Sequence, residues 1–177
     1  MPHLPPESLV FIDESGAKTN MTRLYGWSPS GERAHDSAPH GHWATRTMIS
    51  SLRLDGFTAC MCVDGATDGD VFETYARRVL APSLRPGDIV VLDNLSAHKR
   101  SGIGRTVGSR GAKLLFLPPY SPDFNPIEKM WSKIKTILRS LKARTSEELH
   151  DAIAYALKQI NANDAVSFFE SCGYVLS

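Results

Sequence analysis

The chain is poor in cysteine, has no long apolar run and carries almost no net charge. Its three cysteines, Cys60, Cys62 and Cys172, are odd in number and lack zinc-site spacing, which indicates reduced thiols rather than a disulfide framework. No apolar run approaches the roughly 20 residues that span a bilayer. The N-terminus also lacks the basic and apolar segments of a signal peptide. We therefore expect a cytoplasmic protein with no membrane partner.

Charge is distributed unevenly along the chain, although the net charge is only +1. Residues 94–145 carry eleven Lys and Arg against two acidic residues, whereas residues 1–93 carry eight against twelve. A basic half beside an acidic half fits a polyanion-binding face next to a cation-binding pocket. On charge alone, an ordinary solvated surface is the better interpretation.

The length and composition favour one globular α/β domain. The chain has 177 residues, of which 42% are hydrophobic, and no repeat or low-complexity linker divides it. We expect a single domain over 1–177, with a core at about 8–142 and C-terminal helices at about 146–172. Within this chain we expect no N-terminal helix-turn-helix, because Met1 lies only a few residues before the first expected strand.

Apolar strands alternate with helical patterns. Asp55-Gly56, inside residues 44–65, is the signal for a two-residue hairpin turn. Continuous apolar runs predict three buried strands, at residues 8–13, 87–93 and 112–118. Helices are expected at 67–84, from Pro126 onward, and after the capping box Thr145-x-x-Glu148, with a weaker one at 97–111 because of its four glycines. A hairpin together with parallel strands predicts a mixed sheet with helices on its faces.

Two of the expected strands end in aspartate, at Asp13 and Asp93. If the strands are parallel neighbours, both carboxylates emerge at the same edge of the sheet, where ligands of such sheets gather. Two carboxylates that close repel each other, and a divalent cation removes this penalty. An all-oxygen ligand set favours Mg²⁺ or Mn²⁺.

A third carboxylate follows a stiff segment with four prolines within residues 117–126. Asn125 is expected as the N-cap of the next helix, Pro126 as its first residue, and Glu128 as its third. A side chain in this first turn is presented with little freedom. The helix then continues with Lys129, Lys133 and Lys135, which could follow a phosphate backbone.

Each acidic residue also has a purely structural interpretation. Glu128 is placed as a capping-box glutamate, Asp93 could cap the following helix, and Asp13 could begin a turn. His98 and Lys99, just after Asp93, are candidates for a phosphate contact. Three histidines at positions 35, 40 and 42 lie in a Gly- and Ser-containing segment that indicates a surface loop more than a metal site.

Three segments, taken together, resemble the catalytic blocks of a known family. "FIDESG", "VVLDNLSAHK" and "LPPYSPDFNPIEKMWSKIK" are similar to those of DDE transposases in the bacterial insertion-sequence branch of the mariner superfamily, and "GWSPSGER" is similar to a short segment between the first two. The 34 residues between Asp93 and Glu128 match the spacing of one branch. The resemblance covers about residues 9–141.

This resemblance implies an RNase H-like, integrase-type fold and a DNA transposase. It implies hydrolysis at transposon ends and strand transfer into target DNA, with two Mg²⁺ (or Mn²⁺) ions held by Asp13, Asp93 and Glu128. DNA is the implied partner, within a homodimer, and a separately encoded helix-turn-helix protein could supply end recognition. Two other readings stay open: another RNase H-like nuclease without strand transfer, or a truncated remnant that only binds DNA.

Overall fold

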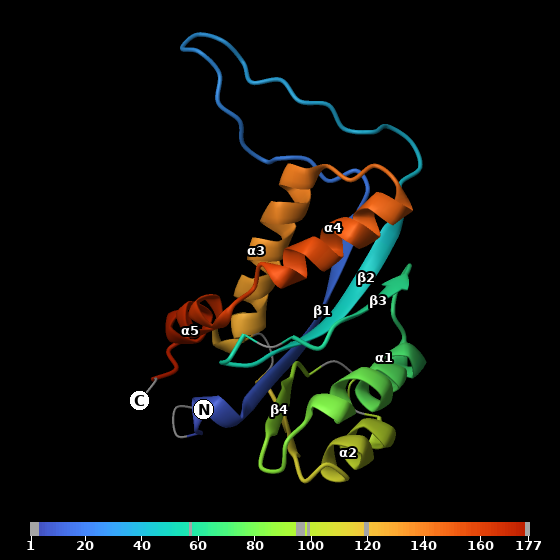
Figure 1. Ribbon diagram of the computed structural model, residues 1–177, viewed down its shortest axis with the longest axis vertical. Helices are drawn as coiled ribbons and strands as arrows, with labels where there is room; N and C mark the ends of the chain where they lie inside the picture. The colour runs from blue at the N-terminus through green and yellow to red at the C-terminus, as the bar shows by residue number, and fades with distance from the viewer. Residues whose placement is uncertain (1–3, 57, 95–97, 99, 119–120, 176–177) are drawn as a thin grey trace.

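A five-stranded mixed sheet forms the centre of the structure, a computed structural model that describes residues 4–56, 58–94, 98, 100–118 and 121–175. The strand order is β3-β2-β1-β4-β5, with β1, β2 and β3 antiparallel and β1, β4 and β5 parallel (Figure 1). The strands are β1 (Leu9–Lys18), β2 (Thr45–Leu52), β3 (Met61–Asp64), β4 (Ile89–Leu92) and β5 (Lys113–Phe116). The expectation of a mixed sheet is confirmed.

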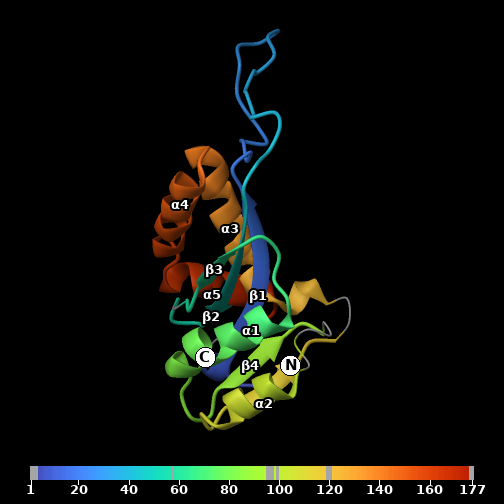
Figure 2. The ribbon, with the colours of Figure 1, turned by 90° about the vertical axis from the view of Figure 1, so that its right-hand side faces the viewer.

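Helices cover both faces of this sheet. They are α1 (Gly69–Tyr75), α2 (Ser101–Gly108), α3 (Pro126–Leu141), α4 (Ser146–Lys158) and α5 (Ala162–Ser171). Figure 2 shows α3 and α4 on one side of β1, and α5 joins them, while α1 and α2 pack on the other side. A π-helical turn (Ala76–Leu80) and a 3₁₀ turn (Ala81–Ser83) extend α1, and further 3₁₀ turns lie at Pro6–Ser8 and Pro122–Phe124.

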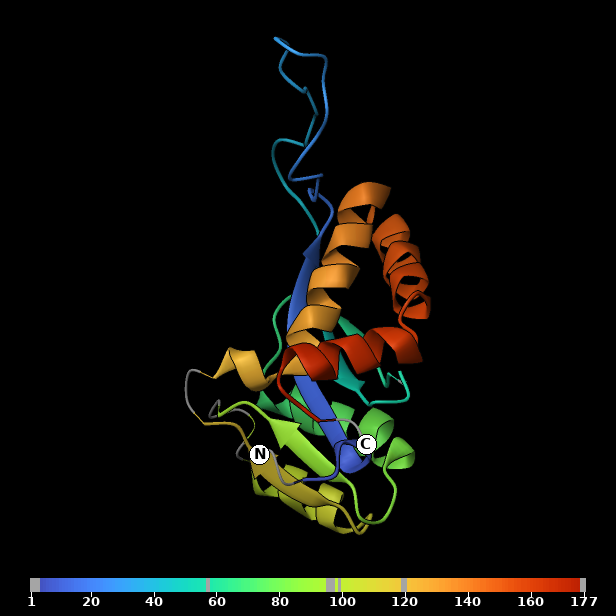
Figure 3. The same ribbon diagram turned by 90° about the vertical axis from the view of Figure 1, so that its left-hand side faces the viewer.

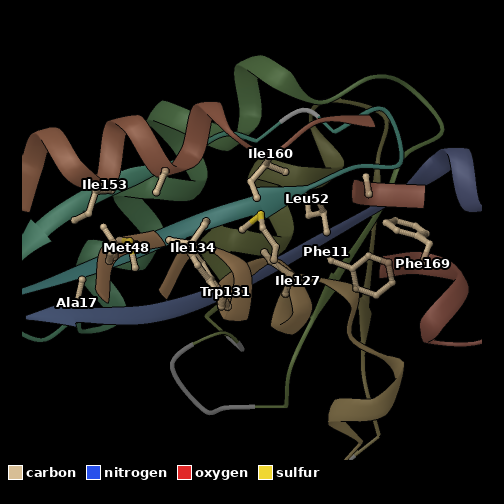
Figure 4. Close-up of a cluster of buried hydrophobic side chains, with 14 of the residues drawn as sticks. Phe11, Ala17, Met48, Leu52, Ile127, Trp131, Ile134, Ile153, Ile160 and Phe169 are labelled. Atoms are coloured by element: carbon tan, nitrogen blue, oxygen red, sulfur yellow. The ribbon is translucent and has the colours of Figure 1, made fainter. Parts of the chain in front are cut away.

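The hydrophobic core has two halves because side chains alternate along the strands. On β1, Leu9 and Phe11 point into the half covered by α3, α4 and α5, whereas Val10 and Ile12 point into the half covered by α1 and α2. Trp131 of α3 lies in the first half and is 2% exposed (Figure 4). The face on which a β1 residue lies therefore follows from its position in this alternation.

Strand β1 is longer than the sequence indicates, so the expectation that it ends at Asp13 is wrong. Antiparallel pairing with β2 continues from Phe11 to Lys18, whereas parallel pairing with β4 stops at Phe11, opposite Val91. The polar residues after Ile12 are held in the strand by β2, which lies on one side only. The alternative of a turn beginning at Asp13 is excluded for the same reason.

The connection between β2 and β3 is not the expected two-residue turn. It runs from Arg53 to Cys60, and Asp55-Gly56 forms only part of it, with the Gly56 N–H donating to Arg53 C=O at 3.0 Å. Gly56 has φ +81°, and a Cβ there would lie 2.6 Å from the Asn161 backbone carbon. The glycine allows the connection to pack against the start of α5.

Helix α2 forms despite its glycines because one of them permits close packing. A Cβ at Gly102 would lie 1.7 Å from Glu73 Oε1 of α1, so a larger residue would force the Glu73 side chain to move. None of the helices in the part of the chain that the structure describes has the length and hydropathy to cross a bilayer.

Residues 20–44 form an extended arm that projects from the end of β1 and returns into β2 (Figure 3). Tyr25 and Trp27 are almost fully exposed on it. Lys142 contacts Asp36 at 2.6 Å, and the Arg144 guanidinium donates to the backbone oxygens at the base of the arm. The three arm histidines are exposed, as expected for a surface segment.

Candidate active site

Asp13 and Asp93 lie at corresponding positions of two neighbouring parallel strands. Phe11 pairs with Val91 in the last parallel pair, and each aspartate lies two residues further along its strand direction. Because side chains alternate, Asp13 points to the same face as Phe11, the face covered by α3. Both aspartates therefore lie at the same edge of the sheet.

Asp13 is oriented by a tryptophan of α3. The Trp131 indole N–H donates to Asp13 Oδ2 at 3.1 Å. Trp131 is otherwise a core residue, which is all that its apolar helical stripe predicts. It lies three residues after Glu128, on the same helix face, and this spacing is the only sequence signal of its polar contact.

Glu128 lies at the third position of α3, as the sequence predicts. Asn125 occupies the N-cap position and Pro126 the first helical position, but the Asn125 side chain makes no capping hydrogen bond. The Glu128 N–H donates instead to Asn125 C=O at 3.1 Å. Complete capping boxes are present instead at the N-termini of α4 and α5. The capping interpretation of Glu128 is therefore not supported.

Glu128 and Asp93 both act electrostatically on Asp13. Burial is the largest cause, and the charges of Glu128 and Asp93 add to it, so the pKa of Asp13 rises to about 7. The Glu14 backbone N–H and the Trp131 indole N–H each lower the pKa, but they do not outweigh the other causes. Ionisation of Asp13 is therefore unfavourable, because its carboxyl is buried near other acidic groups.

His98 contacts Asp93 from the opposite face of the sheet. Its Nδ1 lies 2.5 Å from Asp93 Oδ1, and its ring packs on Phe72. Burial lowers the pKa of His98, but Asp93 and Glu14 outweigh this and raise it to about 9. The side chain is 1% exposed, so this arrangement does not favour the expected phosphate contact of His98, which stays a prediction. Asp93 does not cap α2 either, since that helix has Arg100 at its N-cap position.

The acidic residues fit a divalent cation by chemistry. Three carboxylates on β1, after β4 and at the start of α3 form an all-oxygen set of the kind that Mg²⁺ and Mn²⁺ prefer. Among the described residues, no group of three His, Cys, Asp or Glu side chains is drawn together closely enough to hold an ion. Binding of a metal ion therefore requires these side chains to move closer together. Glu128 is exposed and lies in the first turn of α3.

The expected DNA-contacting lysines differ in their surroundings. Lys133 lies 2.6 Å from both Asp164 carboxylate oxygens and 3.0 Å from Gln159 C=O, so it links α3 to the start of α5. Lys129 is exposed and lines an open groove between α3 and α5 with Ser132 and Ser171. Lys135 is half-buried, and Lys99 lies outside the described residues.

The fold and the site define an α/β domain of the RNase H-like class, with acidic residues where the central parallel strands end. A family model described as "DDE superfamily endonuclease" matches residues 8–150. The chain therefore belongs to the DDE superfamily endonucleases.

Individual relatives agree with this family. The Tcb1 transposase of Caenorhabditis briggsae is 26% identical over 111 residues, which are 60% of this chain and 41% of that protein. Among solved structures, the Mos1 strand transfer complex matches with a TM-score of 0.71 at 15% identity, and a Mos1 mariner paired-end complex with Mn matches with 0.69 at 14%. Each alignment covers 94% of this chain and 52% of that one. The chain thus spans about half the length of these transposases, and its fold is that of a DDE transposase catalytic domain.

Proposed function

We propose that this chain catalyses metal-dependent cleavage of DNA at transposon ends and strand transfer into target DNA. The observation that carries the proposal is that Asp13 and Asp93 lie at corresponding positions of two neighbouring parallel strands, with Glu128 in the first turn of the helix whose Trp131 donates to Asp13. Burial and the charges of Glu128 and Asp93 raise the pKa of Asp13 to about 7. Fold maintenance alone does not favour a buried carboxyl within electrostatic range of two further acidic groups, because their charges raise the cost of ionising it. Perturbed carboxylates of this kind mark functional sites.

Asp13, Asp93 and Glu128 are the proposed catalytic residues and the ligands of two Mg²⁺ or Mn²⁺ ions. Bound divalent cations supply Lewis-acid stabilisation of the reacting phosphoryl group, and two-metal sites place them about 3.5–4 Å apart. Asp13 must lose its proton before it can act as a ligand, so we expect metal affinity to rise with pH. The hydrogen bond from the Trp131 indole N–H orients the Asp13 carboxylate for this role.

Two of the lysines are proposed to differ in their relation to DNA. Lys129 is the favoured phosphate contact, because it is exposed in the groove between α3 and α5 and lies next to Glu128 in the sequence. Lys133 is already paired with Asp164. Lys135 and Lys99 remain candidates on the sequence pattern alone.

The finer assignment is to the bacterial insertion-sequence branch, with a cytoplasmic site of action. The spacing of 34 residues between Asp93 and Glu128 and the proline-rich lead-in support it. Mos1 structures are described as paired-end and strand transfer complexes. By analogy we propose a homodimer that holds two transposon ends. End recognition by a separately encoded helix-turn-helix protein is part of the same proposal.

The test separates strand transfer from simple hydrolysis. The chain is incubated with a duplex that carries the inverted repeat flanking its gene and ends in a free 3′-hydroxyl, together with a supercoiled plasmid and Mn²⁺. Joined products support a transposase, whereas nicked plasmid without joining supports another RNase H-like nuclease. We expect Asp93→Asn to abolish both products while non-specific DNA binding and the thermal unfolding midpoint are retained. Full activity in that variant would remove Asp93 from the site.

A further inference from the structure

His98 lies between carboxylates of two neighbouring parallel strands. Its Nδ1 is 2.5 Å from Asp93 Oδ1, beyond the end of β4, and its Nε2 is 3.9 Å from Glu14 Oε2 on β1. Phe72 of α1 covers the ring, with centroids 4.1 Å apart and planes tilted by 34°. The imidazole is therefore fixed on one side by an aromatic ring and on two others by acidic groups.

Glu14 follows Asp13 directly, so its side chain points to the opposite face of the sheet. The face with α3 thus holds Asp13 and its Trp131 donor, and the face with α1 and α2 holds Glu14 and His98. Asp93 is contacted from this second face and acts electrostatically on Asp13 of the first. Asp93 therefore interacts with a residue on each face of the sheet, His98 on one and Asp13 on the other.

The burial of His98 has a cost that its surroundings must offset. A polar ring that is 1% exposed loses its hydration, and Nε2 makes no hydrogen bond within the described residues. An apolar side chain would fill the same space beside Phe72 without this cost. The contact that distinguishes histidine here is the one with Asp93.

We propose that His98 is a positioning residue, whose Nδ1–H holds Asp93 Oδ1 and thereby sets the direction in which the Asp93 carboxylate faces a divalent cation. The inference rests on the proposed function, in which Asp93 is a metal ligand. Groups that orient a metal ligand typically account for about 10–100-fold in metal affinity or activity. His98 itself touches neither metal nor DNA.

Two substitutions separate the ring nitrogens. In His98→Asn the amide nitrogen takes roughly the position of Nδ1, and in His98→Gln roughly that of Nε2. We expect Mn²⁺ affinity, measured by titration of the full chain, to stay within about threefold of wild type for His98→Asn and to fall by about 10–100-fold for His98→Gln. In DNA cleavage, the Mn²⁺ concentration at half-maximal rate should rise more than the rate at saturating Mn²⁺ falls. His150→Asn, at an exposed histidine of α4, is the matched control.

A spectroscopic measurement reports the contact without metal or activity. In protein labelled with ¹⁵N-histidine, we expect one strongly downfield Nδ1 proton that disappears in Asp93→Asn and persists in Glu128→Gln. If His98→Gln and His98→Asn bind Mn²⁺ equally well, the inference is overturned, whether or not this signal is present. If Asp93→Asn binds Mn²⁺ like the wild type, it is the proposed metal site that fails, and the inference with it.

Discussion

Strand β4 has an aspartate at each end, and the two have opposite surroundings. Asp88, just before the strand, is 4% exposed and paired with Arg53, whose guanidinium also donates to Ser83 C=O. Asp93, just after the strand, lies near the acidic groups Asp13 and Glu14. One end of the strand therefore holds a single closed ion pair, whereas the other end gathers several acidic groups around one histidine, His98.

The two ends of β4 therefore differ in role: the Asp88 end contributes to stability, and the Asp93 end holds the proposed catalytic groups. At the Asp88 end a charge-assisted pair and the Arg85 N–H, which donates to Asp88 Oδ2 at 2.6 Å, complete the local hydrogen bonding. At the Asp93 end His98 engages Asp93, whereas Asp13 accepts a hydrogen bond from the neutral Trp131 indole and lies near two further acidic groups. Substitutions at the two ends should therefore separate activity from stability.

The largest effect is expected at the acidic end. Glu128→Gln removes a proposed metal ligand, and since such ions contribute several kcal/mol of charge stabilisation, Mn²⁺-dependent DNA cleavage should fall by about 1000-fold or more. The thermal unfolding midpoint should be unchanged, because Glu128 is exposed. Glu147→Gln, in the first turn of α4, is the control and should cleave like the wild type. Cleavage by Glu128→Gln within tenfold of wild type would contradict the assignment.

The opposite end should respond in stability. Arg53→Ala leaves Asp88 buried without its partner, and breaking a buried pair in this way costs about 3–5 kcal/mol. Urea denaturation should report this loss. The control is Arg85→Ala, whose exposed pair with Asp55 at 3.4 Å is worth at most about 1 kcal/mol. Equal destabilisation by both variants would show that the Asp88 end is no more stabilising than the surface.

The pH dependence of the free energy of unfolding should report the raised pKa of Asp13. Its pKa is raised from 3.8 to about 7 in the folded state, so the folded protein holds this proton more tightly than the unfolded chain. Stability then falls as the pH rises from about 4 to 7, by about 1.4 kcal/mol per unit of pKa difference at most. Asp13→Asn should remove this fall.

Denaturation in urea without metal measures this difference. Asp13→Asn should be more stable than the wild type by on the order of 2–4 kcal/mol at pH 8 and nearly equal to it at pH 4. A variant less stable than the wild type at pH 8 would show that Asp13 is a stabilising residue of the kind found at the Asp88 end.

The smallest effect concerns the lysines of α3. Lys129→Gln should lower the slope of log affinity against log salt for DNA binding by about one unit, because one phosphate contact is lost. Lys133→Gln should leave this slope almost unchanged and instead lower the unfolding midpoint, because Lys133 is paired with Asp164. The reverse pattern would assign the DNA contact to Lys133.

Much of the fold and site follows from local sequence signals. The apolar runs predict β4 and β5, and Asn125-Pro126 predicts the start of α3 with Glu128 in its first turn. Other features could not be found in this way. The extension of β1 to Lys18 depends on pairing with β2, about 30 residues away, and the links from Lys133 to Asp164 and from His98 to Asp93 depend on packing between separate elements.

The sequence by itself determined which acidic residues are available, in which order, and that Asp93 follows a strand while Glu128 lies in the first turn of a helix, because these are properties of short segments. Only the tertiary structure decided which side chains share a face. Asp13 and Glu14 are adjacent and chemically alike, yet one meets Trp131 of α3 and the other faces His98, because strand alternation sends them to opposite faces of the sheet. What covers each face is set by helices more than 50 residues away along the chain.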